Sequence, residues 1–207
     1  MDPERRAAPL RQALDLLAKA RLCHVVRASA CTGVPLGAEV RQGVVKAILL
    51  DVGLVSAALG LSPQAILAPP DMILANEGAL AEQAVGQALR AAEPSFKEPA
   101  LVYWTSEQRG SQAEIDYVIE HGARVVPVEV KAGTTGRLKS LHLFMALRRL
   151  PLAVRFNADM PSVVEVNAKT TTGHPARYQL LSLPLYVASE IHRWIAAVAG
   201  ATPATAA

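Results

Sequence analysis

The chain has 207 residues, with 21 lysines and arginines against 18 acidic residues, and its formal net charge is +3. A content of 51% hydrophobic and 19% charged residues is typical of a globular chain and argues against general disorder. No apolar run reaches the roughly 18 residues of a membrane span, and no signal-peptide core follows Met1–Arg6. We therefore expect a cytoplasmic protein without a membrane partner, whose two cysteines, Cys23 and Cys31, are reduced core residues. The mild positive charge permits DNA as a partner without requiring it.

The first third of the chain predicts a small, mostly helical region. Apolar residues recur at helical spacing over 10–17, and a short strand is expected at Cys23–Val26. The stretch 44–61 has Lys46 and Asp51 as its only charges and is interpreted as a buried helix. Prolines at positions 63, 69 and 70 then interrupt helix formation. We place a boundary there, between an N-terminal helical, partly winged-helix-like region (residues 1–71) and a second domain (residues 72–199).

The second domain predicts an α/β fold with a mixed sheet. Hydrophobic periodicity alternates between helical and strand-like along this part of the chain. Two hairpin connections followed by a helical crossover would combine antiparallel and parallel strands, with helices on both faces. Residues 200–207 are expected to be a disordered tail. The expected elements are a helix at 77–92, strands at 100–105, 114–120 and 124–131, a helix with Leu138, Leu141 and Met145 inward, a strand at 152–156 and a helix at 185–198.

Charged residues interrupt two of the most apolar strands. In the strand at 124–131, the two-residue period places Glu129 and Lys131 on one face. Asp116 lies in the preceding strand. If His121–Gly122 is a two-residue loop, Asp116 pairs with Pro127 and lies diagonal to Glu129. An odd-length loop would send Asp116 to the opposite face, so convergence of these charges depends on the register.

Two carboxylates and a lysine in that arrangement suit metal-assisted hydrolysis of a phosphodiester. Asp116 and Glu129 would hold Mg²⁺ (or Mn²⁺) through oxygen and leave positions for water and a phosphate oxygen. Lys131 would orient the attacking water and stabilise the charge that builds on phosphorus. The alternative is an ordinary cross-strand ion pair between Asp116 and Lys131 at a solvated sheet edge, and spacing alone leaves both open.

Several segments together carry a resemblance to known families. Asp116 followed thirteen positions later by Glu129-Val130-Lys131, after a helix with an acidic residue, resembles the PD-(D/E)XK restriction-endonuclease-like superfamily. The set as a whole is similar to a prokaryotic domain of unknown function found C-terminal to AAA-type ATPase modules. The segments that carry this resemblance are Asn76–Gln83, Tyr103–Trp104, Gly110–Asp116 and Val128–Gly133.

The resemblance implies a restriction-endonuclease-like αβββαβ core and a set of site residues. Asp116 and Glu129 would be metal ligands, with the Val130 carbonyl as a further ligand. Glu77 competes with Glu82 for the acidic position on the helix, and Glu114 lies close enough to support the site. The catalytic residues implied by position are Glu82, Asp116, Glu129 and Lys131.

The expected function is a metal-dependent nuclease-like domain that hydrolyses DNA phosphodiesters and is normally attached to an AAA-type ATPase. The chain contains no Gly-x-x-x-x-Gly-Lys-Ser/Thr motif, so it is not expected to be an ATPase by itself. Arg137 and Lys139 are candidate DNA phosphate contacts, and a solvated helix face is the competing explanation. The alternative function is a catalytically inactive DNA-binding or protein-interaction module that serves an ATPase partner.

Overall fold

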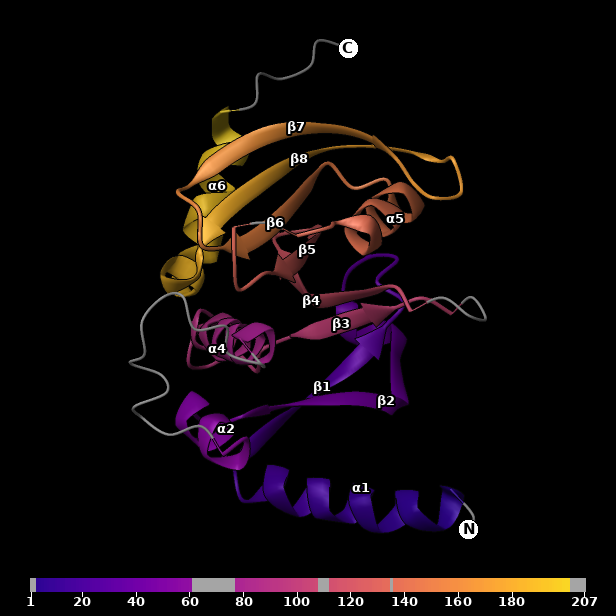
Figure 1. The fold of residues 1–207 in the computed structure, drawn as a ribbon, viewed down its shortest axis with the longest axis vertical. Helices are drawn as coiled ribbons and strands as arrows, with labels where there is room; N and C mark the ends of the chain where they lie inside the picture. The colour runs from indigo at the N-terminus through magenta and orange to yellow at the C-terminus, as the bar shows by residue number, and fades with distance from the viewer. Residues whose placement is uncertain (1–2, 61–76, 108–111, 135, 202–207) are drawn as a thin grey trace.

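The computed structural model describes residues 3–60, 77–107, 112–134 and 136–201. In these residues, five α-helices and one eight-stranded sheet form a mixed α/β fold. The sheet order is β2-β1-β3-β4-β5-β6-β8-β7, from the bottom to the top of Figure 1. The helices are α1 (Pro3–Lys19), α2 (Val52–Ala58), α4 (Glu77–Ala91), α5 (Lys139–Arg148) and α6 (Ile191–Ala201). The strands are β1 (Cys23–Ser29), β2 (Val40–Leu49), β3 (Val102–Thr105), β4 (Glu114–His121), β5 (Arg124–Val130), β6 (Leu152–Asn157), β7 (Ser162–Lys169) and β8 (Pro175–Pro184).

The pairing of the strands follows from the lengths of their connections. Strands β3, β4 and β5 pair antiparallel, whereas β5 and β6 are parallel and α5 forms the crossover between them. Strands β6 and β8 are also parallel, and β7 pairs antiparallel with β8. At the other end, β1 pairs antiparallel with β2 and parallel with β3, so residues before 61 belong to the same sheet. The predicted mixed sheet is confirmed, and α4, β3, β4, β5, α5 and β6 occur in the predicted order.

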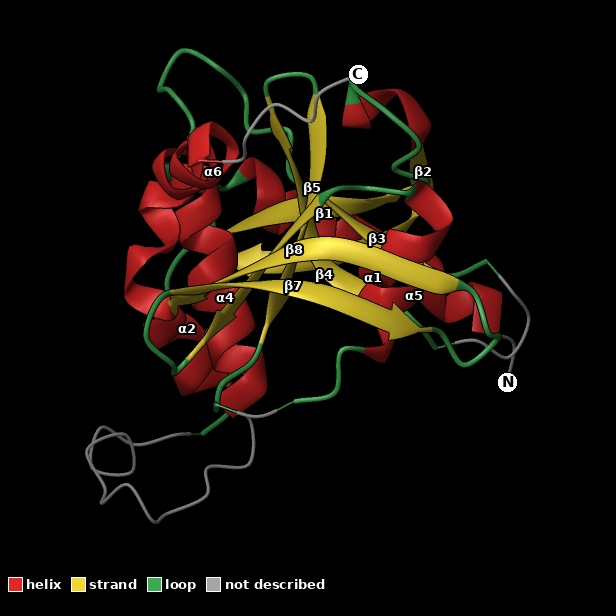
Figure 2. Cartoon of the chain, turned by 90° about the horizontal axis from the view of Figure 1, so that it is seen from above, coloured by secondary structure: helices red, strands yellow, loops and turns green. Residues whose placement is uncertain are grey.

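Helices pack on both faces of the sheet, as Figure 2 shows. Alternation along β5 sends Val126 and Val128 to the core under α4 and α6. The neighbouring Val125 belongs to the core under α5, where Phe144 meets Trp104 edge to face with the ring centroids 5.1 Å apart. Two hydrophobic cores therefore hold the sheet between helices. Both cysteines are buried and free, as expected.

The prediction of a buried helix over residues 44–61 is wrong. Most of its first half belongs to strand β2, and Val52–Ala58 forms the short helix α2 after Asp51, whose side chain accepts a hydrogen bond from Gly53 N at 2.6 Å. A short apolar run has no period that separates strand from helix. Pairing with β1, for example of Ala47 with Val25, makes this run a strand. The predicted boundary near residue 72 lies outside the described residues.

The expected elements also differ from the structure toward the C-terminus. Strands β7 and β8 form a hairpin that was not predicted, although both segments contain the valine or leucine residues typical of strands. The expected helix at 185–198 begins instead with a 3₁₀ turn at Leu185–Glu190 and continues as α6. Helix α6 includes Gly200 and Ala201, and the rest of the expected tail lies outside the described residues. Across the described ranges, no helix has the length and hydropathy needed to cross a membrane.

Helix α4 approaches the sheet closely at Gly86. A Cβ atom placed there would lie 2.7 Å from both Ile48 Cδ1 of β2 and Tyr117 Cζ of β4. Real Cβ atoms do not tolerate such distances, and both neighbours are fully buried in the core, where they have no room to move aside. The absence of a side chain at Gly86 therefore lets α4 lie against β2 and β4 together.

We predict that Gly86→Ala destabilises the fold. Overpacking costs about 1–3 kcal/mol, and the better helix propensity of alanine recovers at most about 1 kcal/mol. The matched control is Gly78→Ala in the same helix, where a Cβ meets nothing within 4 Å. Urea unfolding should show a lower midpoint for Gly86→Ala and an unchanged or higher one for Gly78→Ala. Equal midpoints for the two variants would contradict this account of the contact.

Candidate functional site

Helix α4 is held on the sheet by side-chain hydrogen bonds at two points. Gln83 Nε2 donates to Ala47 O, and Gln83 Oε1 accepts from Leu49 N, both at 2.9 Å along β2. On β4, Tyr117 Oη donates to Glu82 O at 2.9 Å. The backbone at Glu82 is thus tied both to an edge strand and to a strand in the middle of the sheet. These two attachments fix the position of the Glu82 backbone, from which the carboxylate side chain extends.

Three carboxylates from two elements meet beside this attachment. Oxygen atoms of Glu82 on α4 and of Glu114 and Asp116 on β4 all lie within 4.8 Å of one another. The ammonium of Lys46 on β2 is bound among them. Its Nζ lies 2.8 Å from Glu82 Oε1, 2.8 Å from Glu114 Oε1 and 3.1 Å from the backbone oxygen of Asp116. We call these four residues the acidic cluster.

A β-bulge in β4 determines the local geometry of Asp116. Between the residues Ile115 and Val118 that pair with β3, β4 has two residues, Asp116 and Tyr117, opposite one residue of β3. Such a bulge redirects side chains relative to regular alternation. Asp116 Oδ2 accepts a hydrogen bond from the Val130 amide of β5 at 2.7 Å. Asp116 therefore links the acidic cluster to the end of β5.

The β4–β5 hairpin differs from the expected register. Its two-residue loop is Gly122–Ala123, one residue later than predicted. Val118 consequently pairs with Pro127, which had been expected opposite Asp116. Continuing the register past the last pair brings Asp116 opposite Glu129 rather than diagonal to it. Because the shift is two residues, the expected facing holds for the paired residues from Tyr117 to Val128, whereas the bulge places Ile115 in the same core as Val118 instead of in that of Tyr117.

Glu129 and Lys131 form an ion pair at the end of β5. Lys131 Nζ lies 2.5 Å from Glu129 Oε1, and the Glu129 side chain is 7% exposed. The second oxygen, Glu129 Oε2, is buried and has no hydrogen-bond partner in the part of the chain described. Gly136 packs against Lys131, because a Cβ there would lie 2.8 Å from Lys131 Cδ. A buried carboxylate oxygen of this kind calls for a partner, such as a water molecule or an ion, that the described residues do not supply.

Burial and like charge shape the electrostatics of this region. Burial, together with the carboxylates of Glu129 and Glu82, raises the pKa of Asp116 to about 7. Burial also raises the pKa of Glu129, against the opposing effect of Lys131. Burial disfavours the charge on Lys46, but its carboxylate neighbours hold the pKa of its ammonium above the ordinary value. The region therefore retains more positive charge and more protons than free side chains would.

The structure brings the predicted acidic residues into one neighbourhood. Glu82 and Asp116 belong to the acidic cluster, and Glu114 is a full member rather than a support. The Glu129 carboxylate is close enough to raise the pKa of Asp116. Glu77, the competing helix residue, is exposed at the first position of α4.

The other predicted residues surround this neighbourhood. Val130 contributes its amide to Asp116, and nothing tests the role expected of its carbonyl. Arg137 and Lys139 are both exposed, before and at the start of α5. They lie in the segment that follows Lys131 and its neighbour Gly136.

The sequence prediction missed Lys46 as a member of the site. Its signal was present, because Lys46 is the one charge among the apolar residues of 44–50. In a strand, Lys46 shares a face with Ile48, which is fully buried under α4. Interpreting the run as a helix removed this implication. A lone lysine that shares a strand face with a buried residue and is itself largely covered requires a nearby anion, and α4 and β4 supply it.

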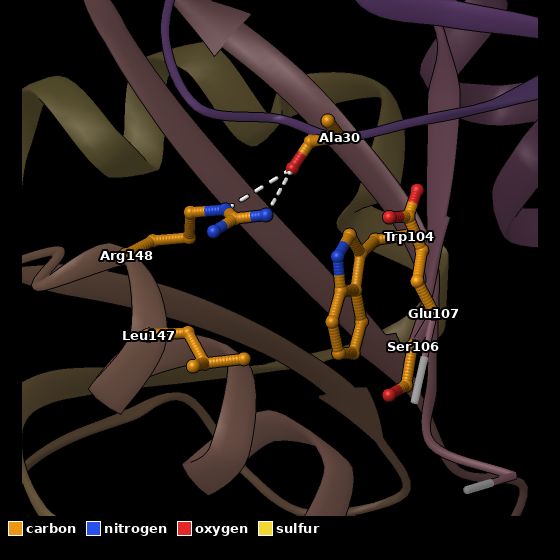
Figure 3. Close-up of a pocket in the computed structure, with 6 residues that line it drawn as sticks. All are labelled: Ala30, Trp104, Ser106, Glu107, Leu147 and Arg148. Atoms are coloured by element: carbon orange, nitrogen blue, oxygen red, sulfur yellow. Dashed lines mark hydrogen bonds between the residues drawn. The ribbon is translucent and has the colours of Figure 1, made fainter. Parts of the chain in front are cut away.

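A separate pocket of about 300 Å³ contains none of these residues (Figure 3). In it, Arg148 donates to the Ala30 carbonyl through Nε at 3.1 Å and through Nη2 at 2.6 Å. This guanidinium joins α5 to the segment after β1. The lining residues are Ala30, Trp104, Ser106, Glu107, Leu147 and Arg148.

The fold and the site define a mixed α/β protein with a carboxylate-rich cluster where α4, β2, β4 and β5 meet. A family model described as "Domain of unknown function (DUF4143)" matches residues 77–185, just over half of the 207 residues. The chain belongs to this family. No curated protein gives a significant match to the chain. The matched segment includes Glu82, Asp116 and Glu129 but not Lys46.

We predict that the wild-type protein loses stability as the pH rises and that Asp116→Asn abolishes this loss. Because the folded state raises the pKa of Asp116, the unfolded chain releases this proton at lower pH. The wild-type free energy of unfolding should therefore fall between about pH 4 and pH 7 by on the order of 1–3 kcal/mol from this group. Urea unfolding in a chelator should show Asp116→Asn gaining relative to wild type from pH 5 to pH 8. A constant difference would rule out the raised pKa.

Proposed function

We propose that this protein is a metal-dependent nuclease that hydrolyses DNA phosphodiesters. In this proposal, α4, β3, β4, β5, α5 and β6 constitute a PD-(D/E)XK restriction-endonuclease-like αβββαβ core. The observation that carries it is Glu129 Oε2, a buried carboxylate oxygen without a partner in the described residues. The other oxygen of this carboxylate, Oε1, forms the ion pair with Lys131, and the Val130 amide between these two residues donates to Asp116. An oxygen in that position is suited to a hard cation.

The residues present fit a hard divalent cation. Asp116 and Glu129 would hold Mg²⁺ or Mn²⁺, with the Val130 carbonyl as a further ligand and Glu82 nearby. When bound, the cation would polarise a phosphate oxygen and lower the pKa of a bound water. The donors are oxygens, as magnesium and manganese prefer, and the carboxylates already interact electrostatically.

The side chains of the protein would perform the remaining steps. Lys131 would orient the attacking water and stabilise the negative charge on the phosphate, while Glu129 Oε1 fixes its ammonium. The Val130 amide orients Asp116 through Oδ2. Because the pKa of Asp116 is raised, its anionic form, which a cation requires, becomes dominant only near neutral pH. Activity should therefore increase from pH 6 to pH 8.

The proposal includes an AAA-type ATPase, attached or separate, as partner. Its basis is the family resemblance, and the chain itself contains no Gly-x-x-x-x-Gly-Lys-Ser/Thr motif. The alternative function is a catalytically inactive DNA-binding or protein-interaction module for that partner. A specific observation favours the alternative: the ammonium of Lys46 already neutralises carboxylates of the acidic cluster. Cleavage assays distinguish the nuclease from the inactive module.

The test is cleavage of single-stranded, duplex and branched DNA at pH 8 with Mg²⁺ or Mn²⁺. We expect metal-dependent cleavage that Asp116→Ala and Lys131→Ala each reduce at least about 100-fold, because each removes a group that contacts the reacting centre. The matched control is Lys169→Ala, which removes an exposed lysine at the end of β7. Circular dichroism should show folded proteins throughout. No cleavage of any substrate, with no cation binding by calorimetry, would favour the inactive module.

We also predict that Arg137 and Lys139 contact DNA phosphates. Both are exposed, in the segment that follows the Glu-x-Lys strand. Arg137→Ala or Lys139→Ala should weaken binding of all DNA sequences alike and reduce the salt slope of the binding constant by about 1 each. Fluorescence anisotropy across a salt series measures this slope. A slope identical to that of Lys169→Ala would remove these residues from the interface.

A further inference from the structure

Lys46 is bound in the manner of a cation. Its ammonium has oxygen neighbours from Glu82, Glu114 and the Asp116 backbone at 2.8, 2.8 and 3.1 Å. The side chain is 17% exposed and passes over the Tyr103 ring, with Nζ 4.6 Å from the centroid. An ammonium surrounded by carboxylate and carbonyl oxygens has the same donor set that a hard divalent ion selects.

Electrostatic repulsion would prevent the Lys46 ammonium and a divalent ion from occupying this position together. Carboxylates this close repel one another unless a positive charge lies among them, and Lys46 supplies one. A divalent ion in the same place would put two more positive charges within a few ångströms of the ammonium. Repulsion in this partly buried region would then drive Lys46 out.

We propose that Lys46 occupies the cation position of the acidic cluster and that a divalent ion binds there only by displacing it. This inference rests on the proposed function, because Asp116 belongs both to the acidic cluster and to the proposed cation site, and it adds a residue from outside the family-matched segment. Lys46 thereby sets the cation concentration at which the site becomes occupied.

The structure lets the side chain move without its strand. The β2 backbone around Lys46 is fixed by pairing with β1 and by the two hydrogen bonds from Gln83. The lysine stem has four rotatable bonds, and its partner Glu114 is 44% exposed, so water is adjacent to the ammonium. Displacement therefore needs side-chain rotation into solvent and leaves the sheet intact.

The first experiment is calorimetric titration of Mn²⁺ into the full chain. We expect Lys46→Met, which keeps the length but removes the charge, to bind Mn²⁺ about tenfold more tightly than wild type. Lys46→Arg keeps the charge and should not gain affinity. Lys169→Met controls for the change in net charge at a distant exposed position. Melting temperatures with and without Mn²⁺ establish that each variant is folded.

A second experiment uses the wild-type protein and needs no folded variant. An amine-acetylating reagent reacts with the neutral amine, which forms by loss of a proton to water when Lys46 leaves its carboxylate partners for solvent, and mass spectrometry measures the rate. Saturating Mn²⁺ should raise the acetylation rate of Lys46 several-fold and leave that of Lys169 unchanged. NaCl at matched ionic strength separates site binding from salt screening, because screening would accelerate both lysines alike.

The outcomes distinguish this inference from the proposed function. Equal Mn²⁺ affinity for wild type and Lys46→Met, or bound Mn²⁺ with unchanged acetylation of Lys46, would overturn the displacement and leave a nuclease site standing. Absence of Mn²⁺ binding by wild type and by folded Lys46→Met would overturn both. Tighter binding by Lys46→Met together with faster acetylation of wild-type Lys46 would establish it.

Discussion

Like charges can be held together in a partly buried place only when positive charge or protons compensate them, and this constraint organises the site. The compensation comes from three places in the fold: Lys46 on β2, Lys131 just after β5 and the raised pKa of Asp116 on β4. Each depends on docking. If α4 did not rest on β2 through Gln83, Glu82 would not face the ammonium. The charge balance of the site therefore depends on the packing of α4 against β2.

Sequence patterns predicted the parts of the site that depend on neighbouring residues of one strand and missed the parts that depend on contacts distant in the sequence. The two-residue period placed Glu129 and Lys131 together because alternation is a property of a single strand. The register with Asp116 was missed by two residues, because loop position depends on which residues take the turn conformation, here with Gly122 at φ 60°. Lys46 depends on contacts more than thirty residues away, which an apolar run does not reveal. The β7–β8 hairpin was overlooked although its composition was typical of strands.

The family-matched segment does not contain all the groups that balance its charge. Residues 77–185 include the three clustered carboxylates but neither β1 nor β2. Strand β3 borders β1, so the sheet of the matched segment continues into the earlier part of the chain. The part of the chain before residue 77 thus supplies both the strand that pairs with β3 and the positive charge of Lys46. Comparison of relatives at the position of Lys46 is therefore as informative as comparison of the carboxylates.

The two borders of the sheet differ in chemistry. At β2, the outward backbone groups of Ala47 and Leu49 are occupied by Gln83 and Gln87 of α4. At the other border, β7 is bonded to β8 on one side and exposes Val163 and Val164. Helix α4 thus covers the Ala47–Leu49 end of β2, whereas in the described residues no further strand pairs with β7, which leaves its outer edge available to another strand. A second copy of the chain that paired through β7 would cover this edge on both molecules.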